Sequence, residues 1–151
     1  MRIIIICLLF CIPIHSFGQK PQEAGQEAEI IQTIQSFFDA MAEKDTVTLA
    51  ALMHPSGVYF VTQAEKPIKV NTHAAYLKNF PMGKEYRFKE EIWDPTVMVD
   101  GDLAILWAPY NFYLNDVFEH CGIDAFSLVK ENGKWMIATT VFSVSKTPCN
   151  E

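Results

Sequence analysis

The stretch ILWAPYNFYLNDVFEHCGIDAFSLV, residues 105–129, decides the fold of this chain. Two long runs of strand-forming residues meet there at Asn115-Asp116, a dipeptide typical of tight hairpin turns. Two further turn signals of the same kind, Asp100-Gly101 and Asn132-Gly133, lie at similar spacing on either side. The pattern predicts an antiparallel meander of four long strands, near 86–99, 102–114, 117–130 and 134–145.

Two prolines indicate that this sheet is strongly curved. Pro95 and Pro109 lie inside predicted strands, and because proline cannot donate to a strand ladder, each predicts a bulge or a bend. If the central turn has two residues, the count from it places Pro109 opposite Gly122. A missing donor opposite a missing side chain favours a sharply coiled sheet, in a register that any bulge would shift by one residue.

Helices precede the sheet. One apolar stripe at helical spacing predicts an amphipathic helix over 26–43, made of Ile30, Ile31, Ile34, Phe37, Phe38 and Met41. Asp45 predicts the N-cap of a second short helix, and a third is predicted to begin at Asn71 or Thr72. The order predicts an α+β fold in which three N-terminal helices pack on a strongly curved antiparallel meander, as a cone-like α+β barrel.

The first eighteen residues have the composition of a secretory signal peptide. Arg2 precedes a long apolar run, and Ser16-Phe17-Gly18 places small residues where a signal peptidase cuts. We therefore expect residues 1–18 to be removed, export to a periplasm or beyond, a flexible lead-in over 19–27 and one domain over 28–149. No later apolar run is long enough to span a bilayer, so no membrane partner is expected after cleavage.

The charge balance argues against one class of partner. Without Arg2 the exported chain has 11 basic and 18 acidic residues, which gives a net charge of −7. Nucleic acids and anionic membranes bind basic surfaces, so neither is expected as a partner.

Two cysteines remain after cleavage, Cys121 and Cys149. Such a pair in an exported protein predicts a disulfide, with two unlinked thiols as the alternative. Closing a loop of about 28 residues would stabilise the fold by roughly 3.5 kcal/mol in the chain-entropy treatment.

This arrangement resembles the nuclear-transport-factor-2-like superfamily, which includes ketosteroid isomerase, SnoaL-like polyketide cyclases and scytalone dehydratase. Three segments are similar to a branch of small bacterial proteins labelled "putative lumazine-binding": Trp107–Tyr113, His120–Phe126 and Gly133–Ile137. The likeness covers residues 28–149. It implies a cone with a pocket between sheet and helices, often in a dimer, and it implies no single chemistry.

One departure from that branch concerns the last strand. After Ile137 such proteins often carry an Asp-Thr-Arg-Arg-like run, whereas this chain has Thr140–Lys146 with the sequence TVFSVSK. If those charges serve a ligand in relatives, this chain lacks them.

The predicted register gathers candidate pocket residues on one face of the sheet. It pairs Trp107 with Asp124 and Asn111 with His120, while Cys121 takes the opposite face beside Tyr110. An apolar floor, an aromatic wall and a few converging polar groups are typical of a small-molecule pocket. The expected ligand-binding residues are Tyr59, Trp93, Trp107, Asn111, His120, Asp124 and Phe126.

His120 and Asp124 are the candidates for catalysis. Four residues apart on a strand, they point the same way with Cα atoms about 13 Å apart, which is wide enough to bracket a ligand. In a water-poor pocket Asp124 would be a general base with a raised pKa, while His120 or Tyr59 would steady a developing oxyanion. The alternative makes Asp124 a fully satisfied structural carboxylate and leaves His120 at the rim.

No metal site and no cofactor are predicted. The histidines of the exported chain, His54, His73 and His120, include no pair at ligand spacing, and phosphate loops and dinucleotide fingerprints are absent.

Three functions stay open. The first is an exported, non-catalytic domain that binds a small apolar or aromatic molecule. The second is a cofactor-independent isomerase, cyclase or dehydratase with Asp124 as its base. The third is a protein-interaction module or homodimer built on the outer face of the sheet.

Overall fold

The structure, a computed structural model, describes residues 21–147 and 149, so the predicted signal peptide lies outside the described residues. Helices come first and a large sheet follows, which confirms the predicted α+β class. The elements in chain order are α1 (Pro21–Glu43), α2 (Thr46–Leu52), β1 (Met53–Gln63), β2 (Lys69–Thr72), α3 (His73–Lys78), β3 (Phe88–Ile92), β4 (Thr96–Asp100), β5 (Leu103–Leu114), β6 (Val117–Glu131) and β7 (Lys134–Val144).

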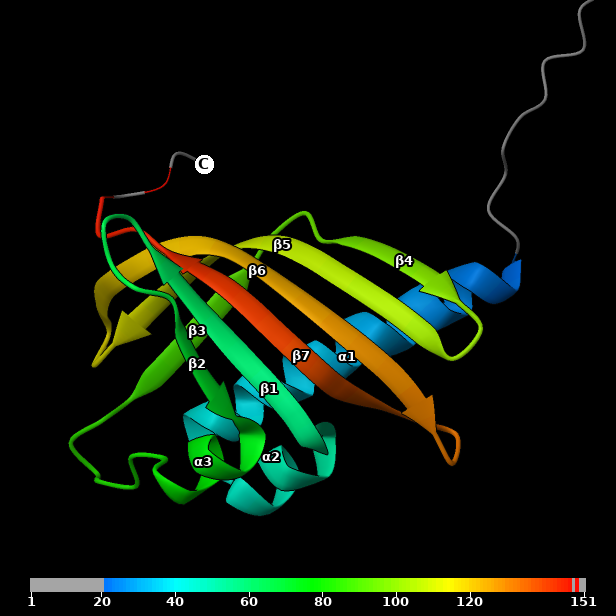
Figure 1. The fold of residues 1–151 in the computed structure, drawn as a ribbon, viewed down its shortest axis with the longest axis horizontal. Coiled ribbons are helices and arrows are strands. Elements are labelled where there is room, and N and C mark those ends of the chain that lie inside the picture. Colours follow the sequence, from blue (N-terminus) through cyan, green and yellow to red (C-terminus); the bar gives the residue numbers. More distant parts are fainter. Residues whose placement is uncertain (1–20, 148, 150–151) are drawn as a thin grey trace, which may run out of the picture.

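The seven strands form one curved sheet in the order β2-β1-β7-β6-β5-β3, with β4 also paired to β5. The pairs are antiparallel except for β1 and β7, which run parallel. Figure 1 shows α1 crossing one face of this sheet, with α2 and α3 gathered at one end. The predicted meander is therefore the β4–β5–β6–β7 part of a larger sheet that curls around α1.

Two expectations about the elements were wrong. Helix α1 begins at Pro21, so residues 21–27 are helical and not a flexible lead-in; proline fits the first helical turn because its missing N–H has no intrahelical partner there. The single strand expected over 86–99 is two strands, β3 and β4, which both pair with β5. The break between them contains Asp94, whose φ of 44° is left-handed, followed by the bend predicted at Pro95.

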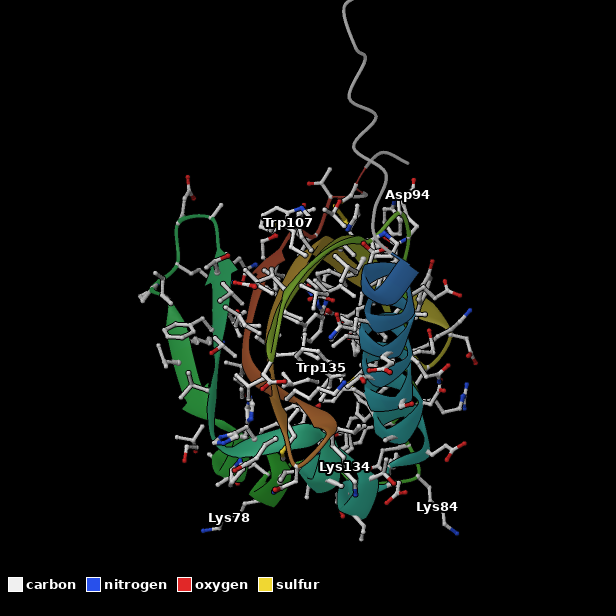
Figure 2. All side chains as sticks on the ribbon, turned by 90° about the vertical axis from the view of Figure 1, so that its right-hand side faces the viewer. Lys78, Lys84, Asp94, Trp107, Lys134 and Trp135 are labelled. Atoms are coloured by element: carbon white, nitrogen blue, oxygen red, sulfur yellow. A yellow bond between two sulfur atoms is a disulfide. The ribbon has the colours of Figure 1, made fainter. Side chains whose placement is uncertain are left out.

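Helix α1 supplies most of the helical side of the core. It buries Ile30, Ile34, Phe37, Phe38 and Met41, whereas Ile31 is 39% exposed and lies outside the stripe. These side chains pack on the concave face of the sheet, against Leu106, Phe126, Leu128 and Ile137. Figure 2 shows Trp135 between α1 and the sheet, where its Nε1 donates to Glu29 of α1 at 3.1 Å.

Side-chain caps define the two short helices, as predicted. Asp45 Oδ1 accepts hydrogen bonds from the backbone N–H groups of Val47 and Thr48, both at 3.0 Å, which starts α2. Thr72 Oγ1 accepts from the N–H of Ala75 at 3.1 Å and starts α3. Helices of seven and six residues are too short to be stable alone, so the caps and the packing on β1 stabilise them.

A bulge at Glu119 changes the predicted register of the central hairpin. Leu114 faces Val117 as expected, but Glu119 has no partner, and Phe112 faces His120. Every pair beyond the bulge is therefore shifted by one residue. Because neighbours in a strand point to opposite faces, the shift exchanges the two faces of β5.

The predicted pairs of Trp107 with Asp124 and of Asn111 with His120 were consequently wrong. Asp124 faces Ala108, and Trp107 faces Ala125. Trp107 lies on the outer face of the sheet, where it is 52% exposed (Figure 2). The inner face of β5 is formed by alternate residues: Ala104, Leu106, Ala108, Tyr110 and Phe112.

Gly122 marks the sharpest part of the curve. It faces Tyr110, not Pro109, and a Cβ on this glycine would lie 2.0 Å from the carbonyl oxygen of Ser143 in β7. That oxygen accepts a hydrogen bond from Tyr110 Oη at 2.8 Å, and Ser143 Oγ accepts from the N–H of Ile123 at 2.9 Å. The backbone of β7 thus lies closer to Gly122 of β6 than any side chain at that position would allow.

A disulfide holds the C-terminal tail beside this close approach of β7 to Gly122. The structure contains the predicted Cys121–Cys149 bond, with a Cα–Cα distance of 6.0 Å. Cys121 also forms an isolated bridge with Ser145 and is fully buried, but it does not line the cavity described below.

Substituting Gly122 with alanine tests the close approach of the β7 backbone to this glycine. We expect Gly122→Ala to lower the free energy of unfolding by at least about 2 kcal/mol, because backbone must move to make room for the methyl group. Chemical denaturation followed by circular dichroism measures the change. Gly25→Ala is the control, since Gly25 lies in α1 with nothing near its Cβ position, and it should keep or slightly raise stability. Equal stability of Gly122→Ala and the wild type would contradict this close approach of the two backbones.

Candidate functional site

A cavity of about 480 Å³ lies between the concave face of the sheet and the helices. Every strand except β4 contributes to its lining, together with α1 and α3. Its wall is mainly aromatic, formed by Phe37, Tyr59, Tyr76, Phe80, Phe88, Tyr110, Phe112, Phe126 and Phe142. The curvature of the sheet that brings the β7 backbone close to Gly122 therefore also encloses this cavity.

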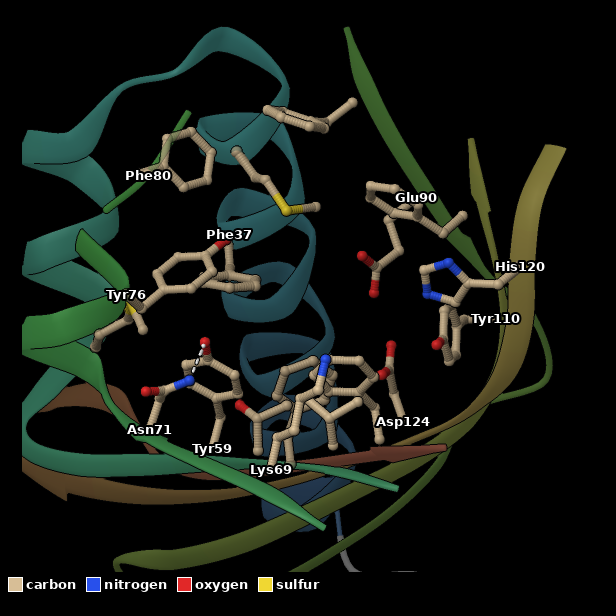
Figure 3. A pocket seen from close by; sticks show the side chains of 18 of the residues that line it. Phe37, Tyr59, Lys69, Asn71, Tyr76, Phe80, Glu90, Tyr110, His120 and Asp124 are labelled. Carbon is tan, nitrogen blue, oxygen red and sulfur yellow. Dashed lines mark hydrogen bonds between the residues drawn. The ribbon is translucent and has the colours of Figure 1, made fainter. Parts of the chain in front are cut away.

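Two carboxyl groups point into the cavity from strands on either side of β5. Glu90 comes from β3 and Asp124 from β6, and Figure 3 shows both carboxyls directed into the same space. Protein atoms surround them: Asp124 is 1% exposed, while Glu90 keeps part of its side chain open to the cavity. The two carboxyls interact electrostatically, and the Oδ2 atom of Asp124 has no hydrogen-bond partner.

Burial controls the protonation of this carboxyl pair. It raises the pKa of Asp124 from 3.8 to about 7, a rise that neighbouring Glu90 partly opposes. Burial and the nearby charge of Asp124 raise the pKa of Glu90 well above its usual range. We infer that the pair shares at least one proton at neutral pH and that Glu90 is the better proton holder.

The neighbours of the pair on β5 and β6 are neutral. Tyr110 donates its hydroxyl proton to the Ser143 carbonyl, and burial together with both carboxylates raises the pKa of the phenol. His120 packs on the Phe112 ring with centroids 4.9 Å apart, and burial lowers the pKa of its imidazole. The His120 Nδ1 atom contacts Glu119, the bulge residue, which in turn pairs with Lys146.

The opposite wall carries polar groups of a different kind. Tyr59 Oη accepts a hydrogen bond from Asn71 Nδ2 at 3.1 Å, and the Tyr59 ring meets Tyr76 edge-on with centroids 5.6 Å apart. Burial raises the pKa of Tyr76. Lys69 of the edge strand β2 is exposed to solvent and also lines the cavity, into which its side chain extends in Figure 3.

The predicted site residues divide among three places. Tyr59, His120, Asp124 and Phe126 line the cavity. Trp93 and Asn111 line a separate polar groove between α1 and β3, and Trp107 lies on the outer face. The Glu119 bulge explains the misplacement of Trp107 and Asn111, and the break after β3 explains that of Trp93. The roles assigned to these residues remain predictions.

Sequence reasoning missed Glu90. The alternation of Phe88, Glu90 and Ile92 contains the signal, because it places a carboxyl between two apolar side chains on one face of a strand. The prediction of one uninterrupted strand over 86–99 concealed where that face begins and ends. Tyr110 was assigned to the wrong face for the same reason as Trp107.

Other types of site are not evident in residues 21–147 and 149. No three or more His, Cys, Asp or Glu side chains come together there in a way that would hold a metal ion. Within the same residues, none of the helices has the length and apolar character needed to cross a membrane.

Comparison with known proteins identifies one family. The family described as "Putative lumazine-binding" matches residues 25–143, whereas no curated protein matches the sequence. Solved structures share the fold: a protein of unknown function from Mycobacterium tuberculosis has 16% identity over 81% of this chain and 73% of that chain, with a TM-score of 0.68.

Two further structures belong to the expected superfamily. A "putative dehydratase" of the nuclear-transport-factor-2-like family from Streptomyces avermitilis is 17% identical over 81% of this chain and 97% of that chain, with a TM-score of 0.66. A nuclear-transport-factor-2-like protein from Cytophaga hutchinsonii is 10% identical over 80% and 98%, with a TM-score of 0.67. The predicted cone-like fold is confirmed; identities this low say nothing of activity.

Asp124→Asn tests the buried charge through stability. The raised pKa means that the folded state binds a proton between about pH 4 and 7 that the unfolded state does not, so the contribution of Asp124 to stability falls as pH rises through this window. Relative to wild type, Asp124→Asn should gain about 4 kcal/mol at pH 8 and little at pH 4. Denaturation at a series of pH values measures this difference.

His73 has the opposite effect on stability: its lowered pKa costs stability below about pH 6.5. Because wild type and Asp124→Asn both contain His73, this contribution cancels in the difference between them. Asp100→Asn, at an exposed turn carboxyl, is the control and should show no such slope. A pH-independent difference between Asp124→Asn and wild type would rule out the buried, protonated carboxyl.

Proposed function

Since this chain belongs to the family described as "Putative lumazine-binding", we propose that it is a binding domain that holds a small, flat, largely apolar molecule in its cavity. The observation that carries this proposal is the aromatic wall around about 480 Å³ of space. Cavities of that size and lining are typical of small-molecule sites. Polar groups are few and stand on two sides, so they would orient a ligand.

The residues at the end of β7 indicate that the ligand needs few charged contacts at this wall of the cavity. Thr140 and Phe142 line the cavity in the segment where similar proteins carry an Asp-Thr-Arg-Arg-like run. A hydroxyl and an aromatic ring replace those charges here, so the binding energy at this wall would come from stacking and apolar burial.

We also propose that the protein is exported and that residues 1–18 are removed. The signal-like composition of these residues supports export. The Cys121–Cys149 disulfide supports it too, because such bonds persist in oxidising compartments.

Native mass spectrometry of protein purified from its own host tests both proposals. We expect a mass excess of one small molecule under native conditions that is lost on denaturation, because the cavity has room for one. We also expect a denatured mass that begins at Gln19. Val61→Trp, which fills part of the cavity, should lose the excess.

The matched control is Val141→Trp, which adds the same side chain to the outer face of the neighbouring strand and should keep the excess. A ligand retained by Val61→Trp would place it elsewhere and contradict the binding proposal. A denatured mass that includes residues 1–18 would contradict export.

A second candidate is an enzyme that moves a proton without a cofactor. Asp124 favours it, because a carboxyl in an apolar pocket with a pKa of about 7 is suited to act as a general base at neutral pH. Glu90, held in its protonated form, would donate a hydrogen bond to a developing oxyanion, as a protonated carboxylic acid does in ketosteroid isomerase. Incubating the ligand identified above with wild type and Asp124→Asn separates the two functions: turnover confined to wild type supports the enzyme.

A third candidate is self-association through the outer face of the sheet. Met98, Ile105 and Trp107 are exposed there on adjacent strands, with Val141 on the far side of β6. Exposed apolar patches of this kind mark interaction surfaces. We expect sedimentation to show a dimer that Trp107→Lys dissociates, because a buried lysine is costly, whereas Val47→Lys on α2 leaves it intact. A monomeric wild type would count against this candidate.

A further inference from the structure

The carboxyl pair in the cavity lacks the partners that buried carboxylates normally have. Asp124 Oδ2 is buried and has no hydrogen-bond partner. In the described part of the chain, neither carboxyl takes part in an ion pair. Buried carboxylates are usually held by arginine, lysine or backbone N–H groups, since an uncompensated buried charge costs several kcal/mol.

Groups that face the pair from the surrounding elements do not supply a positive charge. Tyr110 on β5 is a phenol whose proton goes to a backbone carbonyl. Burial lowers the pKa of His120 on β6, which favours its neutral form at neutral pH, and its Nδ1 atom contacts Glu119. Among the described residues, helix α1 contributes Phe37 and Met41 to the cavity, and it contributes Gln35 and Asp39 to the polar groove that Glu90 also lines. The remaining titratable groups that line the cavity are Tyr59, Tyr76 and Lys69, whose side chain extends into the cavity but forms no ion pair with either carboxyl in the described part of the chain.

The aromatic wall is itself suited to a cation. Aromatic ring faces carry partial negative charge, and a cation close to several of them is attracted. Phenylalanine and tyrosine rings from β1, β3, β5 and β7 line the same cavity as the two carboxyls (Figure 3). The chain as a whole is acidic, with a formal net charge of −6, so long-range attraction acts in the same direction.

We propose that the Glu90–Asp124 pair receives a positively charged nitrogen of the ligand, so that the cavity takes a flat amine or amidine whose apolar body packs among the aromatic rings. This inference rests on the proposed function, because it names the chemical class of the molecule bound in that cavity. One cation balances the single negative charge that remains when the two carboxyls share one proton.

Binding of such a ligand is linked to proton release. A cation beside the pair favours its ionised form, so a proton held by the free protein below about pH 7 leaves when the ligand enters. Affinity should therefore rise roughly tenfold between pH 5.5 and 7.5 for a ligand that stays protonated throughout this range.

Calorimetric titration with two probes of nearly equal shape tests the inference. Benzamidine is a flat cation, and benzamide is its neutral counterpart. We expect benzamidine to bind at least about tenfold more tightly at pH 7.5, and to release protons at pH 6.5 when its binding heats are compared in two buffers of different ionisation enthalpy.

Three variants show whether the carboxyl pair is responsible. Asp124→Asn should weaken benzamidine binding at least about tenfold and keep benzamide binding, which also shows that the cavity is intact, whereas Glu90→Gln leaves the charge of Asp124 in place and should weaken benzamidine binding less. Glu91→Gln, on the opposite face of β3, should change neither. Glu91 pairs with Lys89 at the surface, so it is a matched carboxyl outside the cavity.

Several results would overturn the inference. Equal binding of both probes, benzamidine binding that survives Asp124→Asn, or no binding of either probe at millimolar concentration would each do so. If the native mass excess still disappears in Val61→Trp, the binding function then stands with a neutral ligand. If Val61→Trp instead keeps the excess while the probes behave as expected, the proposed function fails and only the preference of the site for cations remains.

Discussion

The close approach of the β7 backbone to Gly122 is the constraint on which the rest of this structure depends. Because no side chain separates the strands there, the Ser143 carbonyl reaches the Tyr110 hydroxyl, and the sheet bends sharply enough to enclose a cavity. The same bend directs His120 and Asp124, on either side of the glycine in β6, into that cavity. Fold and site are thus consequences of one local approach between two backbones.

The carboxyl pair shows how the site and stability oppose each other. Raising the pKa of Asp124 to about 7 means that burial of this group works against folding at neutral pH. The apolar core under α1 and the Cys121–Cys149 bond offset that cost. Such destabilising polar groups are expected where a protein keeps a binding or catalytic site, since nothing in the packing alone requires them.

Much of the fold could be predicted from sequence, because turns and caps are local signals. Asn115-Asp116, Asp45 and Thr72 determine their own hydrogen bonds, so the hairpin and the short helices were found. Two features depend on partners distant in sequence and were not. The bulge at Glu119 leaves no clear mark in the alternating pattern, yet it reverses the faces of β5; Glu90 acquires its meaning only beside Asp124, which lies on a strand that β3 does not pair with.

The parallel pairing of β1 with β7 has a consequence for the order of folding. These are the first and the last strands in the sequence, so the sheet acquires its complete set of hydrogen bonds only when almost the whole chain is available. Contacts of such long sequence separation slow folding, because a large loop must close before they form. A chain that ends before residue 134 leaves β1 and β6 each with one unpaired edge, so the sheet becomes continuous only when β7 is present.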